Sequence, residues 1–347
     1  MKVKVQTKGG NHEFESGADE NLLFAGLRNG LTLPYECATG TCGTCRARVL
    51  EGDVELNWTE APGLSYVNQE KREILLCQAK AQGECTLRIP AKVTHQNEVG
   101  KRPGDRSGII ENVSVLTRDV VSFDVVLDAP LTFYAGQFAV LEVADVIGRR
   151  AYSMVNYQPD TKVLEFVIKR KPNGRFSDWL FDADPQGAVA KVFGPLGAAT
   201  FHPEEDKNIL CIAGGSGIAG MMSIITQGCG DGYFSNHKGH VFFGVRTAED
   251  VFFLEEFSAF VEAYPNKLEV TVALSDEDVS VDLIAAYPRI NFATGFVHSV
   301  TSESMAGKYE NILAYVAGPP PMVDGALRML VLEARLPGTN IRYDKFG

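Results

Sequence analysis

Residues 37–45 read Cys-Ala-Thr-Gly-Thr-Cys-Gly-Thr-Cys, so that four residues and then two separate three cysteines. A fourth cysteine, Cys77, follows the short apolar run Ile74-Leu75-Leu76, which can deliver it from a core strand. This spacing is typical of four thiolates around two irons. Gly40 and Gly43 let such a loop curl until its backbone amides approach the bridging sulfides. The sequence therefore predicts a [2Fe–2S] cluster whose ligands are Cys37, Cys42, Cys45 and Cys77.

The cysteines allow two other interpretations. A structural zinc site also uses four thiolates, but its ligands usually form two close pairs in sequence, whereas here three share one loop. Cys85 is the alternative fourth ligand, and we interpret it, like Cys211 and Cys229, as an ordinary thiol. Seven cysteines, an odd number, argue against a disulfide framework.

Composition limits the class of protein. The 347 residues predict two or three domains, and a hydrophobic fraction of 45% is enough for more than one core. A net charge of −11 disfavours a general nucleic-acid binder, which needs a basic surface. No apolar run reaches the ~18 residues of a transmembrane helix, and the start of the chain lacks the apolar stretch of a signal peptide. We therefore expect a cytoplasmic protein with neither nucleic acid nor membrane as a partner.

The hydrophobic pattern changes three times along the chain. Residues 1–93 predict a hairpin at 2–6 and 12–15, a short helix at 22–27 that Gly30 ends, and a strand at 46–50. Such a small sheet crossed by one helix is a β-grasp arrangement. Residues 94–106 contain almost nothing apolar and predict a linker.

Residues 107–204 predict an antiparallel barrel, because turn residues separate short β-rich runs. The runs are 108–115, 120–127, 137–143 and 163–169. Most basic residues of this segment, Lys169 among them, lie between Arg149 and Arg175, where they either bind a pyrophosphate or form a solvated face.

Residues 205–347 alternate strands with helices and predict a parallel α/β sheet. The expected strands are 208–213, 240–244, 267–274 and 312–317, and the expected helices are 218–226 and 322–332.

Two glycine-rich turns follow strands of this last segment. Gly214-Gly215-Ser216-Gly217-Ile218 stands between a strand and a helix, as in dinucleotide-binding folds, although tight packing alone also uses glycine. A second turn, Gly318-Pro319-Pro320-Pro321-Met322, follows another strand. It either forms a second ligand-binding loop or simply ends that strand. Arg246 ends the second strand, where an acidic residue usually binds the ribose; taken alone, it favours NADPH.

The ordered motifs resemble the ferredoxin–NADP reductase superfamily. Arg150-Ala151-Tyr152-Ser153 resembles its Arg-x-Tyr-Ser flavin motif, and Gly174-Arg175-Phe176-Ser177 its Gly-x-x-Ser motif. The two glycine turns resemble its Gly-Gly-Thr-Gly and Cys-Gly-Pro-x-x-Met motifs. With an N-terminal plant-type ferredoxin segment, nearly the whole chain is similar to the reductase components of bacterial multicomponent oxygenases. Two positions depart from the pattern: Ala317 replaces a cysteine and Gly220 a proline.

The resemblance implies roles for the motif residues. Tyr152 would stack on the flavin ring, Arg150 would bind its pyrophosphate, Ser153 would hydrogen-bond near N5, and the aromatic Phe346 would lie close by. Residues 174–177 would cap the pyrophosphate with amides and a hydroxyl. The expected cofactor-binding set is Arg150, Ala151, Tyr152, Ser153, Lys169, Gly174, Arg175, Phe176, Ser177, Gly214, Gly215, Ser216, Gly217, Ile218, Arg246, Gly318, Pro319, Pro320 and Met322; the catalytic set is Tyr152, Ser153 and Phe346.

The same resemblance implies a function. Similar reductases mostly use FAD and NADH, some accept NADPH, and they pass electrons through the cluster to an oxygenase or a separate ferredoxin, which would dock near residues 37–45. Two alternatives stay open: a reductase of this architecture for another acceptor, such as a deoxysugar dehydratase system, and a non-catalytic iron–sulfur carrier or sensor.

Overall fold

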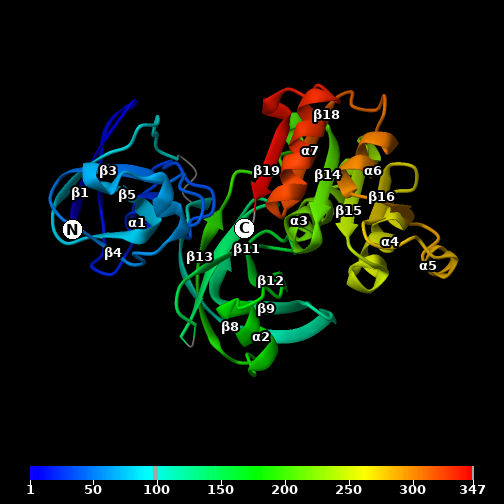
Figure 1. Cartoon of the computed structure of the whole chain (residues 1–347), viewed down its shortest axis with the longest axis horizontal. Helices are drawn as coiled ribbons and strands as arrows, with labels where there is room; N and C mark the ends of the chain where they lie inside the picture. The colour runs from blue at the N-terminus through cyan, green and yellow to red at the C-terminus, as the bar shows by residue number, and fades with distance from the viewer. Residues whose placement is uncertain (97–100, 145, 346–347) are drawn as a thin grey trace.

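A computed structural model describes residues 1–96, 101–144 and 146–345 and arranges them in three units (Figure 1). The N-terminal unit and the C-terminal sheet lie on opposite sides of a central β-structure (Figure 1). The three predicted folds, a β-grasp unit, an antiparallel barrel and a parallel α/β unit, are all confirmed.

The N-terminal unit is a mixed sheet covered by one helix. Its elements are β1 (Lys2–Thr7), β2 (Gly10–Glu15), α1 (Leu22–Arg28), β3 (Arg46–Glu51), β4 (Val54–Leu56), β5 (Glu73–Leu75), β6 (Ala79–Ala81) and β7 (Cys85–Arg88). The strand order is β2-β1-β7-β3-β5, with β1 and β7 parallel. Asn21 caps α1 by accepting a hydrogen bond from the Phe24 amide at 2.8 Å, and residues 22–27 are all buried.

The central unit is an antiparallel sheet that curls towards closure. Its elements are β8 (Gly104–Thr117), β9 (Val120–Leu131), β10 (Phe138–Val143), β11 (Arg150–Ser153), β12 (Thr161–Lys169), α2 (Arg175–Asp182) and β13 (Val189–Leu196). The strand order is β11-β10-β13-β8-β9-β12, and an isolated bridge between Met154 and Phe166 joins the two ends. The flavin motif therefore lies on an end strand, at the seam of the barrel.

The C-terminal unit is an all-parallel sheet with helical crossovers. Its elements are β14 (Asn208–Gly214), α3 (Ile218–Gly230), β15 (Gly239–Val245), α4 (Leu254–Ala263), β16 (Leu268–Leu274), α5 (Val281–Ala286), β17 (Asn291–Thr294), α6 (Val297–Ser304), β18 (Ile312–Gly318), α7 (Pro320–Leu332) and β19 (Ile341–Lys345). The strand order β17-β16-β15-β14-β18-β19 reverses direction between β14 and β18. Open α/β sheets bind ligands at the carboxyl ends of the strands on either side of such a reversal.

None of the helices in the described ranges is long and apolar enough to span a bilayer.

Aromatic packing joins the N-terminal unit to the barrel. The rings of Phe24 in α1 and Phe193 in β13 are stacked, with centroids 3.9 Å apart and planes 3° from parallel. The Arg149 guanidinium lies over the Phe24 ring at 5.0 Å, and the Tyr35 hydroxyl accepts a hydrogen bond from the Gly197 amide at 3.0 Å. One continuous core runs across this junction, so that the first unit is docked on the second.

The predicted linker, residues 94–106, is anchored at both ends. Thr94 exchanges hydrogen bonds with Thr32, and His95 pairs with Leu31. At the other end, β8 already begins at Gly104, because the residues from there on pair with β13. Residues 97–100 lie outside the described part. The exact domain limits of 1–93, 107–204 and 205–347 stay a proposal.

Candidate functional site

The four predicted ligands lie in two pairs, three of them in the cysteine loop. Cys45 and Cys77 place their Sγ atoms 3.3 Å apart, with Cys77 delivered by the turn after β5, and Cys37 is hydrogen-bonded to Cys42. In the described part of the chain, no three His, Cys, Asp or Glu side chains converge as ligands of one metal ion. A [2Fe–2S] cluster takes two thiolates per iron, so this paired arrangement fits it.

Backbone amides surround the first pair. The amides of Thr39, Thr41 and Cys42 donate to the Cys37 Sγ at 3.4–3.5 Å, and the Thr44 amide donates to the Cys42 Sγ at 3.5 Å. Gly40 and Gly43 have φ of +94° and +77°, which the curled loop requires. The loop thus presents amides to sulfur, which is the environment that an anionic cluster needs.

In each pair one thiol ionises more readily and the other holds its proton more tightly. The Cys42 thiol, followed by nearby amides, lowers the pKa of Cys37 to about 4, although burial opposes the shift. Cys77 in the same way lowers the pKa of Cys45, and the same pairings, followed by burial, raise the pKa values of Cys42 and Cys77. Cys85 lies on β7 in register with Val3, and burial raises its pKa too. The 3.3 Å contact between the Cys45 and Cys77 Sγ atoms, and not the pKa, favours Cys77 over Cys85 as the fourth ligand.

The flavin motif lies where the barrel meets the C-terminal unit. The rings of Tyr152 in β11 and Phe176 in α2 are 5.4 Å apart, so that the two predicted flavin segments are neighbours. Burial raises the pKa of Tyr152 far above its ordinary value, and the phenol stays protonated. Ser153 is buried and faces Gly220 in α3.

Arg150 supplies an available cation at this seam. Its guanidinium donates to the backbone oxygen of Arg149 at 2.9 Å and, among the described residues, forms no ion pair within 4.0 Å. The side chain is half-buried. A partly desolvated cation with no carboxylate beside it fits the pyrophosphate of FAD.

The Gly174–Ser177 segment forms the start of α2, with Gly174 as its N-cap residue. The Ser177 hydroxyl, which we expected to cap the pyrophosphate, accepts from the Lys171 amide at 3.1 Å and lies 3.0 Å from the Gly174 oxygen. The Ser177 hydroxyl therefore stabilises the conformation of the loop from Lys171 to Gly174. The amides of the first turn and the exposed Arg175 remain the groups that can face a phosphate.

The two glycine turns meet at the strand reversal. Ala213 in β14 pairs with Ala317 in β18, and a Cβ on Gly214 would lie 3.1 Å from the Met322 Cε and 3.2 Å from the Pro319 Cδ. A Cβ on Gly217 would overlap the backbone of Ala317 and Gly318. The two glycine turns thus lie side by side at the carboxyl edge of the sheet, as a dinucleotide site requires. Ile218, one of the predicted cofactor contacts, is fully buried.

Lys169 and Arg246 face each other across the barrel and the C-terminal unit. Both contact Asp119, with Nζ and Nη2 each 3.1 Å from its Oδ2. Arg246 also pairs with the buried Asp250 at 3.2 Å. Arg246 is therefore already paired with two carboxylates, which weakens the indication for NADPH. Phe346 lies outside the described residues, although β19 carries the chain to Lys345, opposite Gly318.

The structure adds residues that sequence patterns did not reveal. Asp344 lies opposite Ala317, and burial, followed by the charge of Glu36, raises its pKa to about 7. Asp119 contacts Arg246, and Tyr35 contacts Gly197; in each case the partner lies more than 120 positions away in the sequence. No local signal marks any of the three, because their surroundings come from distant segments.

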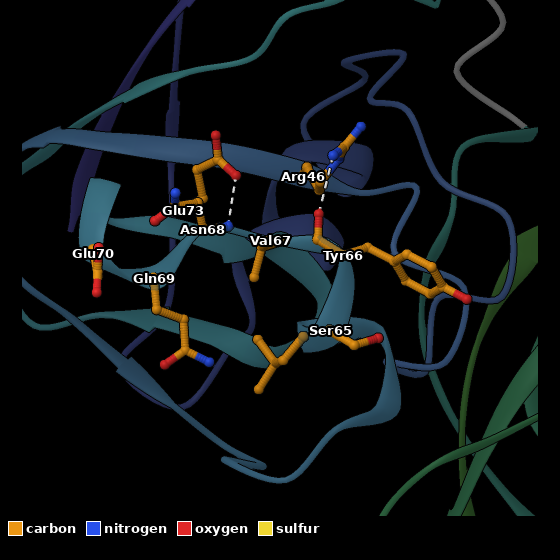
Figure 2. A pocket seen from close by; sticks show the side chains of 9 residues that line it. Arg46, Ser65, Tyr66, Val67, Asn68, Gln69, Glu70 and Glu73 are labelled. Carbon is orange, nitrogen blue, oxygen red and sulfur yellow. Dashed lines mark hydrogen bonds between the residues drawn. The ribbon is translucent and has the colours of Figure 1, made fainter.

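A shallow hollow of about 720 Å³ lies beside the cysteine loop (Figure 2). Along its wall the Arg46 guanidinium donates to the Tyr66 carbonyl at 3.0 Å, and the Asn68 amide donates to Glu73 at 2.8 Å (Figure 2). The Tyr66 side chain is 62% exposed and covers Gly43. The loop is therefore bordered by accessible side chains.

Comparisons with known proteins agree with this arrangement. Residues 5–82 match the 2Fe-2S iron-sulfur cluster binding domain, residues 107–201 the oxidoreductase FAD-binding domain and residues 211–328 the oxidoreductase NAD-binding domain. Ferredoxin–NAD(P)(+) reductase CarAd of Metapseudomonas resinovorans is 34% identical over 100% of this chain and 99% of its own. The ferredoxin–NAD(+) reductase component of the alkene monooxygenase system of Xanthobacter autotrophicus is 32% identical over 96% and 97%.

A solved structure extends the comparison to three dimensions. The ferredoxin reductase in carbazole 1,9a-dioxygenase superposes with a TM-score of 0.82 at 31% identity, covering 100% of this chain and 99% of that one. The chain therefore belongs to the family of oxidoreductases that serve as reductase components of oxygenase systems, with [2Fe–2S], FAD-binding and NAD-binding domains in one polypeptide.

Proposed function

We propose that this reductase takes electrons from NADH and delivers them, through FAD and a [2Fe–2S] cluster, to an oxygenase component or a separate ferredoxin. One observation carries the proposal: the two glycine turns, the flavin motif and the paired thiols lie in three units that pack against one another in that order. The names of the relatives, reductases of carbazole and alkene oxygenase systems, support the class of acceptor.

Residues of the candidate site would hold the nucleotide, the flavin and the irons. The amides of the glycine turns would hold the nucleotide, Arg150 and the first turn of α2 the flavin pyrophosphate, and the four cysteines the irons. FAD accepts two electrons together and releases them singly, whereas the cluster carries one at a time. The chain itself orients these groups, and the neutral Tyr152 phenol places a flat, uncharged ring at the seam.

NADH is the favoured donor for an electrostatic reason. A 2′-phosphate needs an open cation near the end of β15, and Arg246 already contacts two carboxylates. The acceptor would dock over the cysteine loop and the hollow beside Tyr66, since electrons leave from the cluster. Such redox encounters are usually small and transient. A cytoplasmic location completes the proposal.

Two cysteine variants test the path. Cys77→Ser should lose the visible absorption of the cluster and NADH-driven reduction of a one-electron protein acceptor, cytochrome c. It should keep NADH-driven reduction of ferricyanide, which the flavin can serve directly. Cys85→Ser is the matched control, and it should retain the cluster and both activities. The proposed path would be wrong if Cys77→Ser reduced cytochrome c as fast as the wild type, or if NADH left the flavin oxidised.

A further inference from the structure

We propose that Asp119, a barrel residue, sets the preference for NADH by occupying the cations that a 2′-phosphate would need. This inference rests on the proposed function, because it concerns the donor site of the same enzyme. It assigns a specificity-determining role to a side chain of the β8–β9 turn, which lies outside the strand and loops that predict the nucleotide site.

The Asp119 carboxylate is held between the two units. Its Oδ2 lies 3.1 Å from both the Lys169 Nζ and the Arg246 Nη2, and its side chain is only 22% exposed. Two hydrogen bonds of the Asp119 backbone fix the turn that carries it: its amide donates to the Thr117 Oγ1 at 3.4 Å, and its carbonyl oxygen accepts from the Arg170 amide at 2.6 Å. These contacts together hold the carboxylate between Lys169 and Arg246.

The two cations lie beside the nucleotide turns. Arg246 directly follows β15, which pairs with β14 up to Gly214. The Lys169 stem lies 3.9 Å from the position that a Cβ on Gly215 would take. At the end of the second strand, an arginine with no carboxylate beside it accommodates the 2′-phosphate of NADPH. Here the same position holds an arginine whose charge is already paired.

The charges around Asp119 disfavour binding of a 2′-phosphate. Arg118, Lys169 and Arg246 surround Asp119 and Asp250, with the Arg118 Nη2 3.1 Å from the Asp250 Oδ1. Three positive and two negative charges leave one positive charge, which is too little to offset a phosphate dianion and its repulsion by two carboxylates. Removing the charge of Asp119 raises the net positive charge of this cluster to two. Repulsion of the wrong ligand is a common source of specificity.

Binding of two nucleotide fragments tests the inference without turnover. Adenosine 2′,5′-bisphosphate and 5′-AMP differ only in the 2′-phosphate, and calorimetry of the FAD-loaded protein gives both dissociation constants. In Asp119→Asn the affinity for the bisphosphate relative to 5′-AMP should rise about tenfold, as expected for one unit charge removed a few ångströms away. The kcat/KM ratio of NADPH to NADH should move in the same direction.

Two further variants keep the result interpretable. Asp128→Asn makes the same charge change at an exposed position near the other end of β9, and it should leave the affinity ratio unchanged. Adding Arg246→Gln to Asp119→Asn should abolish the gain, because the 2′-phosphate would lose its arginine. The inference is overturned if Asp119→Asn changes both affinities equally, which would mean that Asp119 only joins the two units. A wild type that neither NADH nor NADPH reduces would instead refute the proposed function, and this inference with it.

Discussion

At the scale of single residues, two glycines of the run 214–220 have different surroundings: Gly217 lies in the nucleotide turn and Gly220 in helix α3. A Cβ on Gly217 would overlap the carbonyl group of Ala317, which belongs to the neighbouring β18 and cannot move independently. A Cβ on Gly220 would lie 3.5 Å from the Gly136 oxygen and the Ser153 Cβ, which is ordinary van der Waals contact. Only Gly217 is therefore required by close approach of the backbone, although both lie in one glycine-rich run.

Alanine substitutions separate these two cases. Gly220→Ala should stabilise the protein by about 0.5–1 kcal/mol, because alanine is the better residue within helix α3. Gly217→Ala should destabilise it and weaken NADH binding, since the two glycine turns would have to separate. Urea unfolding monitored by circular dichroism, together with NADH titration, measures both effects. Equal effects of the two substitutions would contradict the geometry.

At the scale of elements, neighbouring strands can create a buried titratable group. His240 in β15 is in register with Glu269 in β16, and its Nδ1 lies 3.3 Å from the Glu269 carboxylate. Burial lowers the pKa of His240, and the charges of Lys308 and Lys238 act in the same direction, against the opposing effect of Glu269. The imidazole is therefore harder to protonate in the folded protein than in the unfolded chain.

This shift predicts a pH dependence of stability. Below pH ~6.5 the unfolded chain binds a proton that the folded protein still excludes, so that the free energy of unfolding falls as pH falls. The contribution of one such group is at most about 1.4 kcal/mol per pH unit. His240→Gln should flatten the slope between pH 5 and 6.5 and leave it unchanged above pH 7.5. Urea unfolding at a fixed FAD concentration measures the slope; identical slopes would exclude His240 as the cause.

The long strands of the C-terminal unit were easier to predict than the short strands. The long apolar strands and the two glycine turns of the C-terminal unit have strong periodicity and turn signals, and they were predicted at nearly their observed positions. Strand β11 is only four residues long, and β17 equally short, so that neither has a usable pattern. The spacing of the cysteines was enough to predict a cluster-binding loop. The Asp119–Arg246 and Tyr35–Gly197 contacts were not, because they join residues 127 and 162 positions apart.

At the scale of the whole molecule, the order of the three units determines the path of electrons. The N-terminal unit is docked on the barrel by the Phe24–Phe193 stack and by the Tyr35 hydroxyl. Burial raises the pKa of Tyr35 to about 12, so that this hydroxyl stays neutral. Tyr35 directly precedes Glu36 and the first predicted ligand, Cys37. Its bond to Gly197 therefore positions the cysteine loop relative to the barrel.

Removing that hydroxyl should affect one step of the path. Tyr35→Phe leaves the Gly197 amide without its partner and should lower the free energy of unfolding by about 1–3 kcal/mol. In stopped-flow experiments with NADH, flavin reduction should keep its rate, whereas reduction of the cluster should become slower. Tyr66→Phe alters an exposed hydroxyl on the same unit and serves as the control. Slower flavin reduction in Tyr35→Phe would contradict a role confined to the junction.

The central claim, one chain that carries electrons from NADH through FAD to a [2Fe–2S] cluster, is tested most directly by an anaerobic titration. The fully loaded protein is titrated with NADH while its visible absorption and the electron paramagnetic resonance of the reduced cluster are recorded. We predict complete reduction at about 1.5 equivalents of NADH per chain, because a two-electron flavin and a one-electron cluster together take three electrons. An endpoint near one equivalent with no signal from a reduced cluster would contradict the claim.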